Sequence, residues 1–311
     1  MEWQGFALVI GACFASAFYQ VTNKKLLVKA APADCVSTVN FLGGGALLLA
    51  VSLLWNPPQV ADWVSWPGGL AWPLVATALL NIIILFGNVR ALKYGDASLI
   101  QPIGATQPLL VLVPSMLILG ETPNRWGYTG LALLALGTYF INFGEEVKGW
   151  ECPAWLRWMG RRARYMAPWQ MLLKNRGVKI ALVVAACGAV SVNFDKLTTA
   201  RADSFIFPPA LILLFCGVVG LVKTVATNEW LKVTREHRAN LISNPFIYAV
   251  TLIGFWLAFK YGNAAYVGAL KRFNVPVTLF LAWLILREQN VKKRWPGAAL
   301  MAIGAALLSI K

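Results

Sequence analysis

The stretch Ala91-Leu92-Lys93-Tyr94-Gly95-Asp96-Ala97 returns, little changed, as Ala258-Phe259-Lys260-Tyr261-Gly262-Asn263-Ala264, 167 positions further along the chain. The same offset carries Glu121 onto Glu288. Self-similarity at a fixed distance is typical of a duplicated unit. We therefore interpret the 311 residues as two related halves.

The composition indicates a membrane protein. Hydrophobic residues make up 58% of the chain and charged residues only 13%, and the charged residues gather between long apolar runs. At this composition a water-soluble fold would have too little polar surface, so the bilayer is the expected solvent. The net charge of +15 does not indicate a nucleic-acid partner, because the basic residues flank apolar spans instead of lining a soluble face.

Ten apolar runs come close to the roughly 20 residues that a helix needs to cross a bilayer. The chain is predicted to be an all-α integral membrane protein with ten transmembrane helices, five in each half. With an odd number per half, the two repeats cross in opposite senses, which is the inverted-repeat architecture of secondary transporters. The predicted spans are Trp3–Val21, Val36–Trp55, Trp72–Leu92, Ala97–Leu119, Trp126–Phe143, Val178–Thr198, Phe205–Thr227, Pro245–Tyr261, Ala264–Leu286 and Trp295–Ile310.

A segment too polar to span separates the halves. In it Trp155 and Met159 fall on one helical face and Arg157 and Arg161 on another, as in a helix that lies in the membrane surface. A solvated linker is the alternative. The predicted boundaries are 1–144 for the first repeat, 145–177 for the basic, Trp-rich interfacial linker and 178–311 for the second repeat.

Lysine and arginine are unevenly distributed over the predicted loops. The side that holds both termini has 5, the side that holds the central linker has 21, and Lys271 and Arg272 lie inside the ninth span. The positive-inside rule then places the central linker in the cytoplasm and both termini outside. We expect a multi-pass protein of a bacterial or archaeal inner membrane, with its first apolar run retained as a span.

The repeated motif also carries a family resemblance. It is followed by a proline in the next span, a Gly-Glu pair and a Trp-x-Gly opening of the last span. This pattern resembles the drug/metabolite transporter superfamily, particularly its EamA-like members, and implies a ten-helix transporter whose termini commonly lie in the cytoplasm, opposite to the charge count. The matching positions are Ala91–Tyr94, Pro108, Gly120-Glu121 and Trp126-Gly127 in the first copy, and Ala258–Tyr261, Pro276, Arg287-Glu288 and Trp295–Gly297 in the second, where Arg287 departs from glycine.

A narrower likeness concerns cargo. Asn23-Lys24-Lys25 resembles the Asn-Lys-Lys of the triose-phosphate and nucleotide-sugar translocators, with Asp195-Lys196 in the equivalent place of the second copy. Lys271-Arg272 is similar to the pair with which triose-phosphate translocators hold a phosphate. The resemblance implies that these two residues hold an anion.

The position of Lys271 and Arg272 supports the same role. They lie seven and eight residues into their span, roughly 11–12 Å deep in a core of about 30 Å. An ionisable side chain there costs roughly 2.5–3.5 kcal/mol and normally faces the bundle interior. Arginine offers a planar fork and lysine a point charge to phosphate or carboxylate oxygens. An internal salt bridge to Asp195, with the other base reaching toward the surface, is the alternative.

Polar groups in other spans are predicted to complete the substrate site, and an interhelical hydrogen bond is the alternative for each. Pro108 and Pro276 are predicted to open their helices for gating, with a simple packing kink as the alternative. For Lys24 and Lys196 the alternative is an interfacial anchor. The predicted substrate contacts are Lys271, Arg272, Asn274, Tyr266, Asn88, Asn81, Tyr19, Gln20, Gln107, Lys24 and Lys196.

No catalytic motif is present: the sequence has no phosphate-cradling Gly-Lys-Ser/Thr loop, no nucleophile–His–acid set and no metal-ligand spacing. We predict no enzyme activity, cofactor or metal, and a secondary active transporter that moves a small anionic or zwitterionic metabolite, phosphorylated cargo included, by alternating access. The alternatives are an exporter of amino acids or neutral metabolites, a lipid-phosphate flippase, and a membrane scaffold that transports nothing. Expected partners are the substrate, membrane lipid and a second copy in a homodimer.

Overall fold

The computed structural model describes residues 2–28, 33–55, 57–60, 62–65, 68–94, 103–104, 106–142, 158, 175–228, 235–286 and 295–309. Within them every regular element is helical, which confirms the all-α prediction for this part of the chain. The elements are α1 (Trp3–Val28), α2 (Ala33–Trp55), α3 (Ala71–Tyr94), α5 (Gln107–Leu110), α6 (Leu112–Leu119), α7 (Arg125–Asn142), α9 (Arg176–Arg201), α10 (Phe207–Ala226), α11 (Arg235–Leu257), η3 (Ala258–Lys260), α12 (Ala264–Leu270), η4 (Lys271–Phe273), α13 (Asn274–Leu286) and α14 (Trp295–Ser309).

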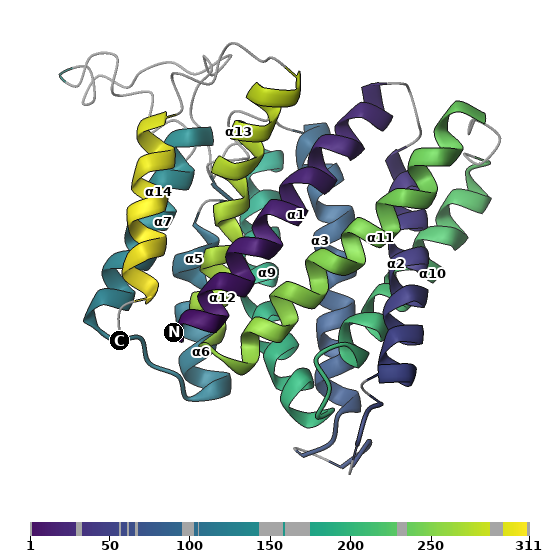
Figure 1. The fold of residues 1–311 in the computed structure, drawn as a ribbon, viewed down its shortest axis with the longest axis horizontal. Helices are drawn as coiled ribbons and strands as arrows, with labels where there is room; N and C mark the ends of the chain where they lie inside the picture. The colour runs from purple at the N-terminus through teal and green to yellow at the C-terminus, as the bar shows by residue number, and fades with distance from the viewer. Residues whose placement is uncertain are drawn as a thin grey trace.

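The helices run up and down across one bundle, and the first turn of α1 lies at the same end as the last turn of α14 (Figure 1). Four described helices are long and apolar enough to cross a membrane by themselves. Two shorter apolar stretches have the same character, Gln107–Leu119 and Pro296–Leu308. The four long ones are Asp34–Trp55, Ala71–Asn88, Arg176–Arg201 and Phe207–Ala226.

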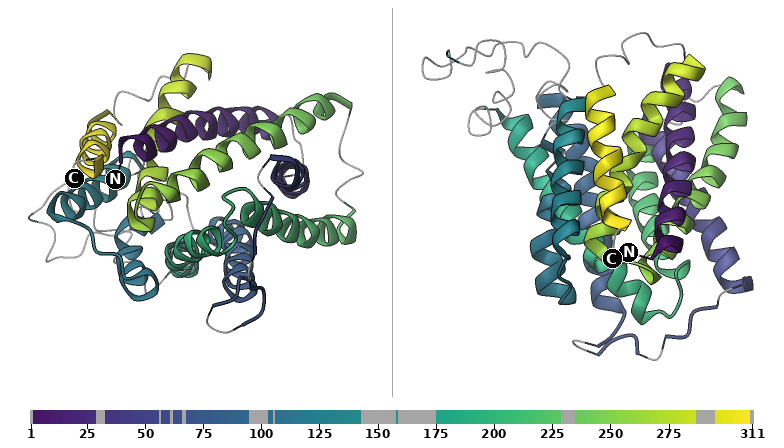
Figure 2. Two further views of the ribbon diagram at one scale, coloured as in Figure 1. Left: turned by 60° about the horizontal axis from the view of Figure 1, so that its bottom comes forward. Right: turned by 60° about the vertical axis from the view of Figure 1, so that its left-hand side comes forward.

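The closest helix pairs join the two halves of the chain. α7 packs on α14, α3 on α9, α2 on α10 and α1 on α11, and each pair takes one member from either side of the central segment. Figure 2 shows α7 and α14 together at one edge of the bundle from two further directions. The halves therefore interdigitate, so that residues more than 100 positions apart form the interior.

Glycine makes the α7–α14 contact possible. A Cβ at Gly130 would lie 2.8 Å from the Gly304 carbonyl oxygen, and one at Gly137 would lie 2.6 Å from the Gly297 carbonyl oxygen. Such close backbone approach suits a bilayer, where lipid supplies no hydrophobic drive between helices. Because Gly130 meets Gly304 while Gly137 meets Gly297, the two helices are antiparallel.

Two predicted span boundaries are wrong. α1 continues through Asn23 to Val28, seven residues beyond the predicted end. α11 begins at Arg235, so Pro245 lies inside a helix instead of opening one. The proline fits because Gly43 of α2 faces it: a Cβ at Gly43 would lie 2.8 Å from the proline Cβ. The predicted ninth span has the expected extent but is interrupted at Lys271–Phe273.

Of the predicted linker 145–177, the structure describes only Trp158, which is 82% exposed, and residues 175–177 at the start of α9. The surface-helix prediction for Trp155–Arg164 otherwise lies outside the described residues.

Candidate functional site

The predicted basic pair lies at a break between two helices. α12 ends at Leu270, Lys271–Phe273 form one 3-10 turn, and α13 restarts at Asn274. Pro276, in the first turn of α13, has no N–H to donate to the preceding turn, which favours a break at this point. The Cys13 thiol of α1 donates to the Leu270 carbonyl, at the end of α12, at 3.4 Å. This break places both bases within the span instead of at its end.

Arg272 connects the second half of the chain to the first. Its guanidinium donates to the Gln107 side-chain oxygen, in the first turn of α5. The Gln107 amide in turn lies against α9, where a Cβ at Gly188 would come within 2.5 Å of its nitrogen. A guanidinium has five N–H donors, so this single bond leaves donors for a ligand. Arg272 is partly buried, in keeping with a side chain that lines an internal space.

Lys271 is held by aromatic rings. Its ammonium lies 5.3 Å from the ring centre of Phe255 and 5.1 Å from that of Phe259. Ring faces attract a cation without neutralising its charge. Among the described residues no hydrogen bond or ion pair of this ammonium is found, so its positive charge is available to an anion.

Asp195 is the nearest candidate for a counter-ion. It is only 8% exposed and accepts a hydrogen bond of 2.6 Å from the Thr77 hydroxyl. Its carboxylate and the Lys271 ammonium attract each other electrostatically. They do not approach to within 4.0 Å, however, so the described contacts include no direct salt bridge of the kind we weighed as the alternative.

A network of hydroxyl and amide groups extends from Asp195 between α3 and α9. The hydroxyls of Thr77 and Ser191 lie 2.9 Å apart, and the Asn81 amide donates to Ser191 at 3.1 Å. Asn81, one of the predicted substrate residues, therefore joins the two halves here.

A second polar group lies where α1 meets α13 and α2. Asn274 donates to the Ser16 hydroxyl at 3.2 Å, and Asn40 donates to the Tyr19 hydroxyl at 3.0 Å. The Tyr19 ring stacks on Tyr248 of α11 with centroids 4.9 Å apart. Tyr19 and Asn274, predicted from different halves of the sequence, thus belong to helices that pack together.

Two predicted residues lie in other surroundings. The Tyr266 hydroxyl accepts from the Asn124 N–H at 3.0 Å and lies against Gly127, where it fastens the start of α7. Lys196 forms an ion pair with Glu121 and donates to the Gly262 carbonyl at 2.9 Å. Glu121 also accepts the Ala264 N–H at 2.8 Å, so it both caps α12 and binds a base.

Two further predicted residues, Asn88 and Gln20, have no contact with the basic pair among those described. Asn88 and Gln20 are exposed on α3 and α1, and Gln20 donates weakly to Ser16 at 3.5 Å. The side chain of Lys24 lies outside the described residues. Pro108 occupies the first turn of α5, as Pro276 does in α13, so both prolines follow a helix restart.

Several residues of these networks were not predicted: Ser16, Thr77 and Ser191 are small hydroxyls within apolar helices, which commonly hydrogen-bond across membrane helix interfaces. Phe259 had a clearer indication in the sequence. Phe259 lies in the second copy of the repeated seven-residue motif, at the position where the first copy has Leu92. The aromatic residue thus occurs in the half of the chain that also has the basic pair.

Comparison with known proteins bears on the family of this chain. Residues 3–143 match the model of the EamA-like transporter family. The predicted resemblance to the drug/metabolite transporter superfamily is thereby confirmed, and the similarity supports an integral membrane protein and, in general terms, a transporter.

Two further similarities bear on length and fold. A Sinorhizobium sp. protein described as "Uncharacterized transporter in cobO 3'region" is 26% identical over 134 residues, which cover 42% of this chain and 94% of that protein. That relative is thus about as long as one half of this chain. A solved structure described as "Crystal structure of protein" has a TM-score of 0.71 at 16% identity, covering 99% of this chain and 96% of its own, and it supports the fold alone.

Proposed function

We propose that this EamA-like protein is a secondary carrier for a small organic anion, and that Lys271 and Arg272 bind the anionic end of the cargo. The observation that carries the proposal is the helix break at Lys271–Phe273, which holds two cations inside a span. One cation faces only aromatic rings and the other only a neutral amide among the described residues.

Charge balance favours a cargo with a negative end. Lys271 and Arg272 together exceed the single carboxylate of Asp195 by one positive charge. Since uncompensated charge within a membrane is costly, an anion is the ligand that such a site stabilises most. Phosphate or carboxylate oxygens can each accept two N–H groups from the guanidinium fork. A cationic cargo would instead be repelled.

Alternating access by two inverted repeats is supported by contacts that recur when the halves are exchanged. Gly87 of α3 faces Val184 of α9, and the counterpart of this contact is Gly254 of α11 facing Ala12 of α1. The residues correspond by an offset of 167 for α3 and α11 and of 172 for α1 and α9. Such repeats rock around a site at the bilayer midplane in known secondary carriers.

The same exchange relates the contacts of the site. With the same offsets, Asn274 corresponds to Gln107 and Ser16 to Gly188. The hydrogen bond from Asn274 to Ser16 therefore has its counterpart in the contact of Gln107 with Gly188. The basic pair has no such counterpart, because Gly104 stands in the place of Lys271. We infer that the second half binds the charged end of the cargo and the first half its neutral remainder.

We also propose an orientation in the membrane and a cellular location for this carrier. The excess of basic residues opposite the termini supports a cytoplasmic central linker, outward termini and a bacterial or archaeal inner membrane. No cofactor is needed, because gradients or exchange drive a secondary carrier.

The test is uptake into proteoliposomes loaded with unlabelled substrate. Labelled phosphate esters, dicarboxylates and neutral amino acids are offered in parallel, each with and without the matching internal substrate. Saturable uptake of an anion class supports the proposal. Uptake of neutral amino acids alone would favour the amino-acid exporter, and absence of any uptake would favour a scaffold.

A further inference from the structure

A groove on the outside of the bundle, between α3 and α9, has the form of a lipid site. It encloses about 420 Å³ and is lined along most of its length by aliphatic side chains. At its floor α3 approaches α9 closely because Gly87 has no side chain: a Cβ there would lie 2.4 Å from Val184 Cγ2. Ile83 and Val183 on its walls are 46% and 56% exposed, and in a bilayer such surface faces lipid tails.

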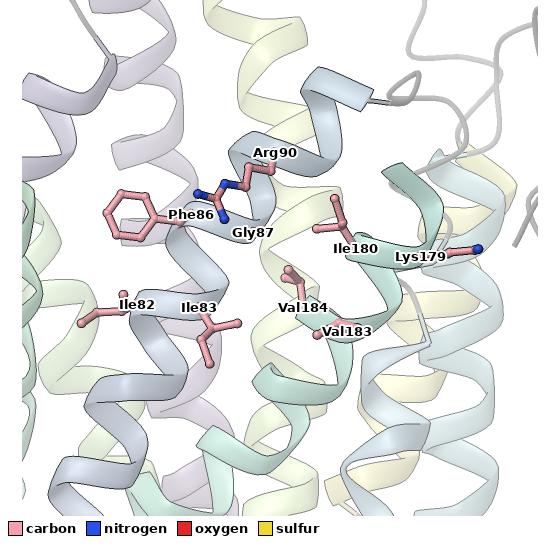
Figure 3. A pocket seen from close by; sticks show the side chains of 9 residues that line it. All are labelled: Ile82, Ile83, Phe86, Gly87, Arg90, Lys179, Ile180, Val183 and Val184. Atoms are coloured by element: carbon pink, nitrogen blue, oxygen red, sulfur yellow. The ribbon is translucent and has the colours of Figure 1, made fainter. Parts of the chain in front are cut away.

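Two bases stand where this groove nears the ends of its helices. Arg90 lies four residues before the end of α3, and Lys179 lies three residues after the start of α9. Figure 3 shows the aliphatic side chains along the groove, with Arg90 on α3 and Lys179 on α9; the Arg90 guanidinium points toward Phe86 and the Lys179 ammonium points away from α3. Both side chains are exposed, and no ion pair or hydrogen bond of either is found among the described residues.

A second groove, between α1 and α11, is the counterpart of the first under exchange of the halves. It encloses about 690 Å³. With the offsets of 167 and 172, Gly87 corresponds to Gly254 and Val184 to Ala12, which line the second groove. Four further wall residues, Ile83, Phe86, Ile180 and Val183, have as counterparts Val250, Ile253, Leu8 and Gly11, which also line it; the counterpart of Ile82, Ala249, does not.

The two grooves differ in charge. Arg90 of the first corresponds to Leu257 of the second, and Lys179 corresponds to Ala7. The bases are therefore not required by the shape that the grooves share. They also lie at the end of the bundle opposite the termini, the side on which the loop lysines and arginines gather.

We propose that the α3–α9 groove binds an anionic phospholipid, with an acyl chain along the aliphatic walls and the headgroup phosphate at the end of the groove where the exposed side chains of Arg90 and Lys179 lie. Two exposed bases near the helix ends and an apolar channel beside them match the two parts of such a lipid. The α1–α11 groove binds acyl chains without selecting the headgroup. This inference is independent of the cargo and of the role of the inner basic pair.

The test is native mass spectrometry of the detergent-purified protein with phosphatidylglycerol and phosphatidylcholine of identical chains. At about 1 kcal/mol for each base near the membrane surface, the double variant R90A/K179A is expected to bind phosphatidylglycerol about thirtyfold less tightly, with phosphatidylcholine binding unchanged. The matched control R125A/K260A removes one arginine and one lysine from the opposite end and is expected to bind as the wild type does.

The converse variant A7K/L257R places the bases in the second groove and is expected to gain a further phosphatidylglycerol. Size-exclusion profiles confirm that each variant is folded. Equal phosphatidylglycerol affinity in the wild type and R90A/K179A overturns the proposal, as does an equal loss in R125A/K260A. Displacement of the lipid by water-soluble glycerol phosphate also overturns it, because a bare phosphate would then be the ligand.

Discussion

Replacing Arg272 by alanine is the most direct test of the inner site. The guanidinium of Arg272 reaches the Gln107 side-chain oxygen, and the described residues hold no acidic group in ion-pair contact with it. The substitution therefore leaves no carboxylate unpaired, and the bundle is expected to fold. What is lost is the fork that would hold two oxygens of the cargo.

The expected loss of affinity follows from the two hydrogen bonds that the guanidinium would donate to those oxygens. A hydrogen bond to a charged group contributes at least about 1.5 kcal/mol, so two contribute about 3 kcal/mol. That energy corresponds to roughly 150-fold in affinity. Arg272→Lys keeps the charge but loses the fork, and a loss of roughly tenfold is expected.

The assay is exchange in proteoliposomes of whichever anion the wild type transports, together with its dissociation constant from ligand-dependent thermal shift. Lys260→Ala is the matched control, since it removes one exposed positive charge that lies 5.0 Å from the Phe205 ring. Exchange by Arg272→Ala within about threefold of wild type, with an unchanged melting temperature, would refute the proposed role of the guanidinium.

Three further substitutions test neighbouring parts of the structure. Gly130→Val pushes a side chain into an α14 carbonyl only 2.8 Å from the new Cβ, so overpacking of about 1–3 kcal/mol should lower the melting temperature in detergent. Tyr266→Phe removes the hydroxyl that accepts the Asn124 N–H, and the free energy of unfolding should fall by about 1 kcal/mol. The affinity for the cargo should stay unchanged; a weaker affinity would show that Tyr266 contacts the cargo. Asp195→Asn removes the carboxylate that attracts Lys271. The anion should then bind roughly fivefold more tightly, an effect on the order of 1 kcal/mol. Equal or weaker binding would contradict the role of Asp195 as counter-ion to Lys271.

The repeated seven-residue motif and the apolar runs were sufficient to predict much of this architecture. Helices in a bilayer must satisfy their own backbone groups, so long apolar runs leave little choice of secondary structure. The family resemblance followed from the same motif and was confirmed by the match over residues 3–143. The depth of Lys271 and Arg272 within their span was also readable, because helical rise converts residue number into distance.

The sequence did not indicate which polar side chains contact one another. Asn274 meets Ser16, and Arg272 meets Gln107, across separations of 258 and 165 residues, and the hydropathy of a single span contains no information about such partners. Tyr266 illustrates the difficulty: it stands five residues from Lys271 on the chain, yet its hydroxyl bonds to the start of α7.

The amino-acid order alone thus predicted the helical membrane fold and the presence of two cations inside a span, because these depend on local composition and period. Only the tertiary structure decided that the helix breaks at Lys271–Phe273, that rings and amides surround the cations, and that two equivalent outer grooves differ in charge. Those features depend on which helix faces meet, and close glycine contacts between the halves, such as Gly130 on Gly304, set that packing.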